Sequence, residues 1–339
     1  MAVVKSVREI AAVTLDDALR GVSEPVSEPA SGPVVLRGLV RHWPMVAAAR
    51  EGRGDAYLRG FYKDATVNAM LGAPAIDGRF FYNDDLSGFN FNAVRTRLDT
   101  VLDELERQRS ASPAPAIYVG STTVDTCLPG FRDHNDIDLG GREALASIWI
   151  GNRSRIAAHY DVPDNIACVA AGRRRFTLFP PAQLNNLYVG PLDFNPAGQA
   201  ISLVDFTQPD FTRFPRFAEA LAHAQVAELE AGDAIFIPSM WWHHVEALDA
   251  FNVLVNYWWR SVPDYVDTPS NALQLALMTM RDLPPAQRAA WQEQFRHYVF
   301  EADADTAAHI PHAARGILGP LGDDATRALR SQLLKKLNR

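Results

Sequence analysis

Residues 229–246 have the sequence L-E-A-G-D-A-I-F-I-P-S-M-W-W-H-H-V-E, in which two apolar runs are separated by turn residues. Gly232 and Asp233 predict a turn into A-I-F-I-P, a run with the length and composition of a buried strand. Two adjacent histidines, His243 and His244, follow in the next run. Histidines behind a buried strand are typical either of core imidazoles bonded to the backbone or of a metal site, and this stretch alone leaves both open.

Similar short β-rich runs extend from about residue 117 to residue 260. Glycine, proline and asparagine divide them, and no long helical pattern lies between them. The runs are A-S-I-W-I-G, N-I-A-C-V-A-A-G, R-R-F-T-L-F-P-P, Q-V-A-E-L-E-A-G-D, A-I-F-I-P and F-N-V-L-V-N-Y-W-W. This spacing predicts an antiparallel sandwich or barrel rather than a doubly wound parallel sheet. We therefore expect a mainly β fold.

The chain outside this region predicts a division into three parts. Residues 1–32 contain a short helical pattern within 7–20, capped by Thr14 or Asp16, and then a proline-rich linker. The folded body is expected over 33–260, where α/β elements, including a helix over 98–109, precede the β-rich region. Helical spacing returns after Pro269 and predicts a helical segment within 261–339.

Composition limits the classes of partner. The formal charge is −7 with a pI near 5.7, which gives no long-range attraction for nucleic acid or an anionic membrane. The two cysteines, Cys127 and Cys168, suggest neither a disulfide framework nor a cysteine zinc site, in keeping with a reducing compartment. The N-terminus lacks a secretory pattern, and no apolar run has the length of a membrane span. We expect a cytoplasmic protein that binds neither nucleic acid nor a membrane.

A histidine and an aspartate follow the predicted strand A-S-I-W-I-G. In an extended segment, His159 and Asp161 point to the same face, roughly 7 Å apart along the strand. A second H-x-D, at His134 and Asp136, lies in a polar segment without strand pattern and predicts a solvated loop. The first pair and one of the two adjacent histidines match the two-histidine, one-carboxylate triad of non-haem Fe(II) oxygenases, which leaves positions open for a chelating cosubstrate and O₂.

Four motifs taken together resemble a known enzyme family. H-Y-D, G-D-A-I-F-I-P, W-W-H-H-V-E and V-N-Y-W are similar to motifs of the JmjC-type, cupin-like Fe(II)/2-oxoglutarate oxygenases, most closely the asparaginyl hydroxylase that inhibits the hypoxia-inducible factor. The resemblance covers about residues 33–260 and is strongest over 159–259. It implies a double-stranded β-helix (cupin or jelly-roll) core, with His159, Asp161 and His243 as ligands of Fe(II). Spacing alone does not choose between the two adjacent histidines.

The resemblance also implies a site for 2-oxoglutarate. The family has a basic residue two positions after a glycine, which here makes Arg174, after Gly172, the partner of the distal carboxylate. The relatives have lysine at this position, and an arginine can pair with a carboxylate through two hydrogen bonds. Tyr118 and Thr122 would donate hydroxyls to the same carboxylate. The two arginines that flank Arg174 are expected on the opposite, solvated face.

Polar residues of the last strand are expected near the metal-bound end of the cosubstrate. By the same matching Asn165 and Asn256 lie there, and period-two alternation puts Asn256 and Trp258 on one strand face. A core asparagine bonded to the backbone is an equal alternative on sequence grounds. One position departs from the family pattern: its common threonine three residues before the first ligand is Ile156 here.

These features predict an Fe(II)- and 2-oxoglutarate-dependent dioxygenase that uses O₂ to hydroxylate a C–H bond of a protein, peptide or amino-acid substrate. One alternative is a JmjC-type N-methyl-lysine demethylase. Another is a cupin that binds a metal or a small ligand without oxoglutarate turnover, for which His244 could be an additional ligand. Residues 203–217 resemble the insert beside the substrate groove of the peptide hydroxylase, and an ordinary connecting loop is the alternative.

In the relatives, C-terminal helices form a dimer. Apolar residues recur here at helical spacing and predict either a homodimer interface or an intramolecular core. They are Leu273, Leu277, Trp291, Phe295, Tyr298, Leu329, Leu333 and Leu337.

Overall fold

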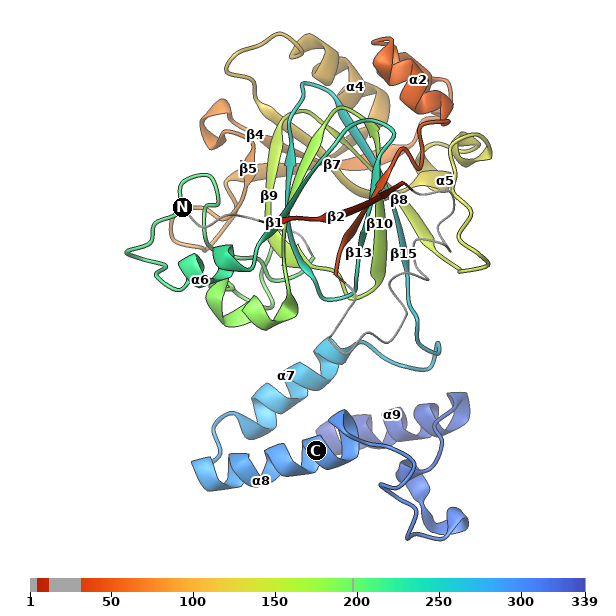
Figure 1. Cartoon of the computed structure of the whole chain (residues 1–339), viewed down its shortest axis with the longest axis vertical. Helices are drawn as coiled ribbons and strands as arrows, with labels where there is room; N and C mark the ends of the chain where they lie inside the picture. Colours follow the sequence, from red (N-terminus) through yellow and green to blue (C-terminus); the bar gives the residue numbers. More distant parts are fainter. Residues whose placement is uncertain (1–4, 12–31, 197, 339) are drawn as a thin grey trace. The chain divides into compact units, whose positions relative to one another are not determined.

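The computed structural model describes residues 5–11, 32–196 and 198–338. The chain divides into two compact units, Met1–Arg260 and Ser261–Arg339. The first unit contains the β body and the second contains helices α7 to α9 (Figure 1).

The strands described in the first unit form two sheets. The smaller sheet has the order β1-β12-β11-β14-β9-β5, and the larger has the order β2-β3-β13-β10-β15-β8-β7-β4-β6. The strands of the smaller sheet are β1 (Lys5–Ser6), β5 (Arg79–Phe80), β9 (Ser154–Tyr160), β11 (Arg174–Phe179), β12 (Gln225–Leu229) and β14 (Trp242–Ala247). Those of the larger sheet are β2 (Arg8–Ala11), β3 (Val34–Arg37), β4 (Thr66–Gly72), β6 (Phe91–Arg97), β7 (Ala116–Thr123), β8 (Leu145–Gly151), β10 (Asp164–Ala171), β13 (Ala234–Ile237) and β15 (Asn252–Trp259).

Alternating side chains explain why the two sheets face one another. In β10, Ala167 and Val169 belong to a buried cluster that also contains Phe176 and Leu178 of the smaller sheet. The intervening Cys168 points to the other face and joins the core beneath the helices. Both faces of β10 are therefore buried, which explains its continuous apolar sequence. The predicted mainly β, jelly-roll fold is confirmed.

Short helices cover the outer face of the larger sheet (Figure 1). They are α2 (Pro44–Arg50), α3 (Gly54–Arg59), α4 (Leu98–Arg107) and α5 (Val124–Cys127). The buried residues of α4 are Leu98, Val101, Leu102 and Leu105, the spacing of one helix face. The predicted helix over 98–109 is thus confirmed, apart from its last residues.

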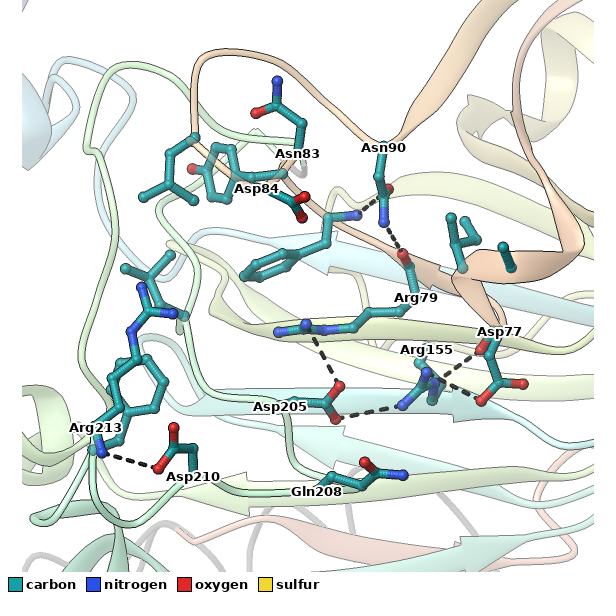
Figure 2. Close-up of a pocket in the computed structure, with 17 residues that line it drawn as sticks. Asp77, Arg79, Asn83, Asp84, Asn90, Arg155, Asp205, Gln208, Asp210 and Arg213 are labelled. Carbon is teal, nitrogen blue, oxygen red and sulfur yellow. Dashed lines mark hydrogen bonds and ion pairs between the residues drawn. The ribbon is translucent and has the colours of Figure 1, made fainter.

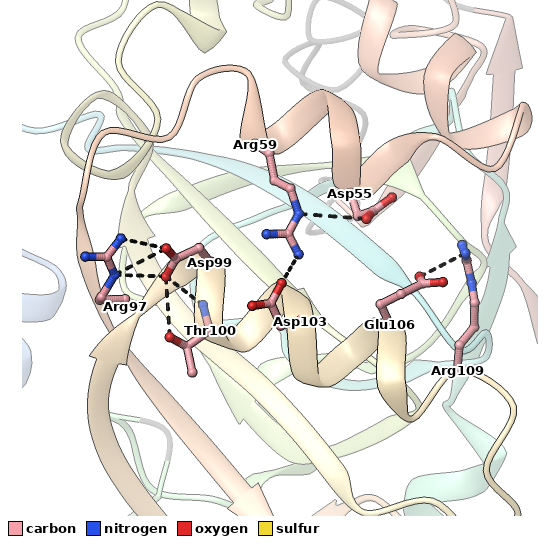
Figure 3. A network of polar contacts seen from close by, with 8 residues as sticks. All are labelled: Asp55, Arg59, Arg97, Asp99, Thr100, Asp103, Glu106 and Arg109. Atoms are coloured by element: carbon pink, nitrogen blue, oxygen red, sulfur yellow. Dashed lines mark hydrogen bonds and ion pairs between the residues drawn. The ribbon is translucent and has the colours of Figure 1, made fainter.

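The opposite side of α4 is charged, as Figure 3 shows. Its carboxylates pair with arginines at N–O distances of 2.7 Å (Arg59–Asp103, Arg97–Asp99) and 3.0 Å (Arg109–Glu106). Exposed pairs of this kind contribute about 0–1 kcal/mol each, so the apolar face holds α4 in place.

Other short helical segments complete the first unit. The outer face of the smaller sheet is covered by α6 (Phe217–Ala222), whose buried residues share a cluster with Phe179 and Trp242. The 3₁₀ segment η3 (Pro181–Asn186) leads to Leu187, which belongs to the same cluster. Two more 3₁₀ turns are η1 (Pro74–Ile76) and η2 (Phe131–Asp133).

The helical pattern predicted within 7–20 does not include its first residues, and its predicted caps, Thr14 and Asp16, lie outside the described residues. Arg8–Ala11 forms β2, which pairs with β3 in parallel register. Arg37 of β3 binds Glu9 and also Asp233, each at an N–O distance of 2.6 Å. The free edge of β3 offers backbone partners that a local helical spacing cannot reveal. The remainder of the predicted helix and linker, residues 12–31, lies outside the described residues.

The second unit is helical, as predicted. It consists of α7 (Pro269–Met280), α8 (Pro285–Phe295), a π-helical turn η4 (Arg296–Phe300), the 3₁₀ turns η5 (His312–Ala314) and η6 (Gly316–Leu318), and α9 (Asp323–Leu337). Among the residues described in this unit, only Ala307 is buried. Within the described parts of the chain, no helix combines the length and apolar character needed to cross a membrane.

Candidate metal centre

Two neighbouring strands bring three candidate ligands together. His159 lies near the end of β9 and is the cross-strand partner of His243 on β14, while Asp161 directly follows β9. One ligand atom from each residue lies within 4.8 Å of the others, and in the described part of the chain this is the only such group of three or more. The His243 Nε2 and Asp161 Oδ2 atoms are 3.6 Å apart. The structure therefore assembles the predicted triad.

Hydrogen bonds orient the triad toward a common point. The Nδ1 atoms of His159 and His243 contact the backbone carbonyls of Ala157 and Trp241 at 2.9 and 3.0 Å. A histidine that donates from Nδ1 to a carbonyl leaves the lone pair of Nε2 free for a metal.

Two further side chains hold the carboxylate. Trp258 Nε1 and Asn165 Nδ2 each donate to Asp161 Oδ2 at 3.0 Å. Asn256 then donates to Asn165 Oδ1 at 2.7 Å. Asn256 and Asn165 thus form a chain of hydrogen bonds that ends on Asp161, and Trp258 donates to the same oxygen separately; the sequence predicted all three near the cosubstrate.

The electrostatic environment favours neutral imidazole. Burial, and then the proximity of His159, lower the pKa of His243 to about 4. A neutral imidazole is the form that binds metals. Two such nitrogens and one carboxylate suit Fe(II) with open positions, so the residues present fit the metal that the family pattern implies.

The neighbouring histidine lies on the other face of β14. His244 packs against Phe206 with ring centroids 4.7 Å apart and is not part of the triad. Burial lowers its pKa to about 3. The second H-x-D also lies apart: His134 is exposed, and Asp136 accepts from Arg132 at 2.9 Å. The predicted solvated position holds for His134, whereas Asn135 beside it is fully buried and Asp136 is half-buried.

A cavity of about 240 Å³ opens beside the triad. His159 and Tyr118 line it, together with Trp149 and Ile156. The apolar Ile156 thus lies in the cavity wall at the position where the family pattern has threonine.

Arg174 lies buried near Tyr118, with only 2% of its surface exposed. Its Nε atom has no hydrogen-bond partner, and among the described residues no carboxylate pairs with it. Burial lowers the pKa of Arg174 to about 10 and raises that of Tyr118, which keeps the phenol a hydrogen-bond donor. The adjacent Arg173 and Arg175 instead face outward and bind Asp249 and glutamates, as predicted.

The structure does not bring Thr122 to the cavity. Its hydroxyl donates to the Gly120 carbonyl at 3.0 Å, and the adjacent Ser121 lines the cavity instead. The register of β7 against β8 shifts between Val119 and Thr122. The alternation of side chains between the two faces of β7 is therefore interrupted before Thr122.

Trp149 is a site residue that the sequence analysis missed. Its ring stacks on Tyr118 at 5.7 Å and meets Trp258 edge-on at 5.9 Å. Its Nε1 atom is buried without a partner. The sequence does contain a pattern that could have identified Trp149: a tryptophan that alternates with aliphatic residues in A-S-I-W-I-G. Large aromatic side chains on an inner sheet face commonly line cavities.

The sequence of this chain is similar to those of known proteins. The model of the cupin-like domain family matches residues 27–265. Lysine-specific demethylase JMJ31 of Arabidopsis thaliana is 34% identical over 37% of this chain and 24% of its own length. tRNA wybutosine-synthesizing protein 5 of Gallus gallus is 35% identical over 38% of this chain and 42% of its own.

A longer match is to lysine-specific demethylase 8 of Xenopus tropicalis, which is 26% identical over 67% of this chain and 48% of its own length. The chain thus spans less than half of each of these three relatives. Because the family model covers more than half of the chain and the described fold is a two-sheet β body, the chain belongs to the cupin-like domain family.

Proposed function

We propose that this protein is an Fe(II)- and 2-oxoglutarate-dependent dioxygenase that hydroxylates a C–H bond of a protein, peptide or amino-acid substrate. The observation that carries the proposal is Arg174, a buried cation without an anionic partner among the described residues. A buried, unpaired charge is costly and calls for a counter-ion. The distal carboxylate of 2-oxoglutarate would supply that charge beside the cavity next to the triad.

The roles of the residues follow from their contacts. His159, Asp161 and His243 would hold iron, and the bound metal would couple the oxidative decarboxylation of 2-oxoglutarate by O₂ to substrate oxidation. Trp258 fixes the orientation of the Asp161 carboxylate. Tyr118 remains protonated and is placed to donate a hydrogen bond beside the guanidinium.

A distal site built on arginine differs in geometry from one built on lysine. Arg174 has five N–H donors in a planar fork, so it can engage both oxygens of one carboxylate. Ile156 supplies no hydroxyl where the family pattern has one, and the second donor of the fork compensates for this loss. The resemblance to the asparaginyl hydroxylase supports a polypeptide substrate.

Demethylation is the second candidate, because two of the relatives are named lysine-specific demethylases. Hydroxylation of an N-methyl C–H bond releases formaldehyde, whereas hydroxylation of a carbon-bound C–H leaves the oxygen on the substrate. A screen of peptides with and without methyl-lysine, followed for formaldehyde and for a mass gain of one oxygen atom, separates the two reactions.

The proposal is tested by adding 2-oxoglutarate to the anaerobic, Fe(II)-loaded protein and following the visible metal-to-ligand charge-transfer band. We expect a saturable band in the parent. In Arg174→Ala the affinity should fall by about tenfold or more, because hydrogen bonds to charged groups contribute about 1.5–3 kcal/mol. Arg175→Ala, altered on the opposite strand face, is the matched control. Iron binding without a band at any concentration would contradict the proposal.

A homodimer through the second unit is also proposed. An apolar groove of about 310 Å³ between α7 and α8 is lined by Leu277, Met280, Trp291 and Phe295, among others. Among the described residues of this unit only Ala307 is buried, which is too small a core for the unit to be stable alone. We therefore expect a second copy of the chain to cover the apolar groove.

Analytical ultracentrifugation tests this pairing. Leu277→Asp should convert the dimer to a monomer, because it places a charge in the groove. Thr279→Asp, an exposed position on the same helix that does not line the groove, should remain dimeric. A monomeric parent at micromolar concentration would contradict the dimer.

A cytoplasmic location is a further proposal. Cys127 and Cys168 are both free and buried, as is usual for proteins of reducing compartments. Imaging of the tagged protein in its own cells tests it.

A further inference from the structure

Trp149 contacts two side chains that have different roles in the proposed site. It lies on β8 and lines the cavity beside the metal triad. It stacks on Tyr118 with ring planes inclined by 29°, and it meets Trp258 at 83°. Because β8 lies between β7 and β15 in the larger sheet, the two partners come from its two neighbouring strands. Both geometries are those of favourable aromatic pairs.

The register of the sheet explains why long side chains are needed for the second contact. Trp149 is the cross-strand partner of Leu254, whereas Trp258 is the partner of Leu145. Trp258 therefore lies four residues further along β15, roughly 13 Å at the rise of a strand. Ser147, on the same face of β8 between Leu145 and Trp149, is small and leaves space for the two indoles to meet.

The ring of Trp149, rather than its N–H group, makes these contacts. The Nε1 atom is buried and has no hydrogen-bond partner among the described residues, which costs the folded state free energy. Hydrogen bonding within the described chain therefore does not explain an indole at this position. The indole instead supplies a ring large enough to reach both partners.

Ring contacts set the direction of the Tyr118 phenol. Its hydroxyl has no hydrogen bond to any described residue, although the Arg174 charge acts on it. Phe80 contacts the Tyr118 ring at a centroid distance of 5.5 Å and an angle of 33°. The phenol is therefore aimed by the rings of Phe80 and Trp149.

Phe80 is held independently of Trp149. Its neighbour Arg79, on the outer face of the smaller sheet, pairs with Asp205 at an N–O distance of 3.5 Å (Figure 2). Asp205, which belongs to the segment 203–217, also pairs with Arg155 of β9 at 3.4 Å. These ion pairs hold the paired strands β5 and β9 together from outside. The contact of Phe80 with the phenol should therefore persist when Trp149 is changed.

The contact with Trp258 affects the metal ligand. Trp258 Nε1 donates to Asp161 Oδ2 at 3.0 Å. Trp258 is only half-buried, so the surrounding core does not enclose it completely. An indole held by one hydrogen bond can tilt about that bond, and the Trp149 ring restricts this tilt.

We propose that Trp149 is a positioning residue for both ends of the site. It aims the Tyr118 hydroxyl at the cosubstrate position beside Arg174, and it holds Trp258 in place for its hydrogen bond to Asp161. The first part rests on the proposed function, whereas the second requires only a bound metal. A tryptophan that merely filled the core would contribute to stability and to neither affinity.

Calorimetric titration with Mn(II), and then with 2-oxoglutarate at saturating Mn(II), tests both parts. In Trp149→Leu we expect the Mn(II) affinity to fall by about threefold or more, a part of the 10–100-fold loss typical when a donor to a metal ligand is removed. The affinity for 2-oxoglutarate should fall by about two- to tenfold, the effect of losing one aromatic pair. Trp149→Phe, a milder change for the core, keeps a ring and should lie between Trp149→Leu and the parent in both affinities.

Double variants separate positioning from packing. If Trp149 acts through Trp258, adding Trp149→Leu to Trp258→Phe should not weaken Mn(II) binding further. Tyr118→Phe removes the hydroxyl and keeps the ring, so adding Trp149→Leu to it should not weaken 2-oxoglutarate binding further. Additive losses in either pair would overturn that part of the proposal.

Trp259→Leu is the matched control. Trp259 lies on the same strand as Trp258, but it is buried in the core on the opposite face and stacks on Phe236 at 6.0 Å. This variant should lower the free energy of unfolding and keep both parental affinities.

Equal losses of affinity in Trp149→Leu and Trp259→Leu would show a general loosening of the sheet and would overturn the proposal, as would parental affinities in Trp149→Leu. Mn(II) binding requires neither 2-oxoglutarate nor turnover. A failure of this inference is therefore distinguishable from a failure of the proposed function.

Discussion

Replacing Arg174 by methionine should stabilise the free protein and weaken its response to 2-oxoglutarate. Only 2% of the surface of Arg174 is exposed, and no carboxylate among the described residues balances its charge. Methionine fills a similar length with an unbranched apolar chain and no charge. The two effects should therefore separate: greater stability without the ligand, and weaker stabilisation with it.

The magnitude follows from the pKa of the guanidinium. Burial lowers this pKa from its usual value to about 10. At about 1.4 kcal/mol per pH unit, the charged form costs the folded state on the order of 3 kcal/mol. Because the folded-state pKa is the lower one, this cost is present at every pH below about 10 and disappears only as the pH rises above it. Removing it should raise the melting temperature of the first unit by about 5–10 °C.

Scanning calorimetry with and without 2-oxoglutarate, in the presence of a redox-inert divalent metal, measures both effects. A ligand at 100 times the parent's Kd should stabilise the parent by about 2.7 kcal/mol and the Arg174→Met variant, with an affinity lower by tenfold or more, by about 1.4 kcal/mol or less. Arg175→Met, whose side chain binds Glu228 and Glu246 on the outer face, should change stability by about 1 kcal/mol or less and keep the full response. A less stable Arg174→Met variant that responded to 2-oxoglutarate as fully as the parent would refute the reasoning.

Three further changes test the centre and its support. His159→Ala should abolish Fe(II) binding in calorimetric titration because it removes one of three ligands, whereas His134→Ala, altered at the exposed H-x-D, should bind Fe(II) like the parent. Trp258→Phe should weaken Fe(II) binding by about 10–100-fold, because it removes the donor to the ligand carboxylate; an unchanged affinity would show that this hydrogen bond does not orient the ligand. Gly172→Ala should lower the free energy of unfolding by about 2 kcal/mol or more, because the backbone φ is +73° and the added Cβ would lie 2.3 Å from Asn252 Oδ1. Urea titration measures this change, and a variant as stable as the parent would contradict the expected strain.

The sequence by itself determined the features that depend on local alternation. Short β-rich runs divided by turn residues predicted the β body, and period-two alternation in β15 put Asn256 and Trp258 on the inner face, where the structure places them. The same rule separated the buried Arg174 from its outward neighbours. Side-chain direction in a strand is a property of adjacent residues, so it can be derived without knowing which strands pair.

Only the tertiary structure decided the features that depend on pairing between distant strands. The adjacent histidines of β14 point to opposite faces of the strand. His243 belongs to the triad because it pairs with His159 of the neighbouring strand β9. A register shift in β7 removes Thr122 from the cavity, and the edge of β3 recruits residues 8–11 into a strand. Register and edge pairing arise from hydrogen bonds between these segments, and no local pattern in the sequence records them.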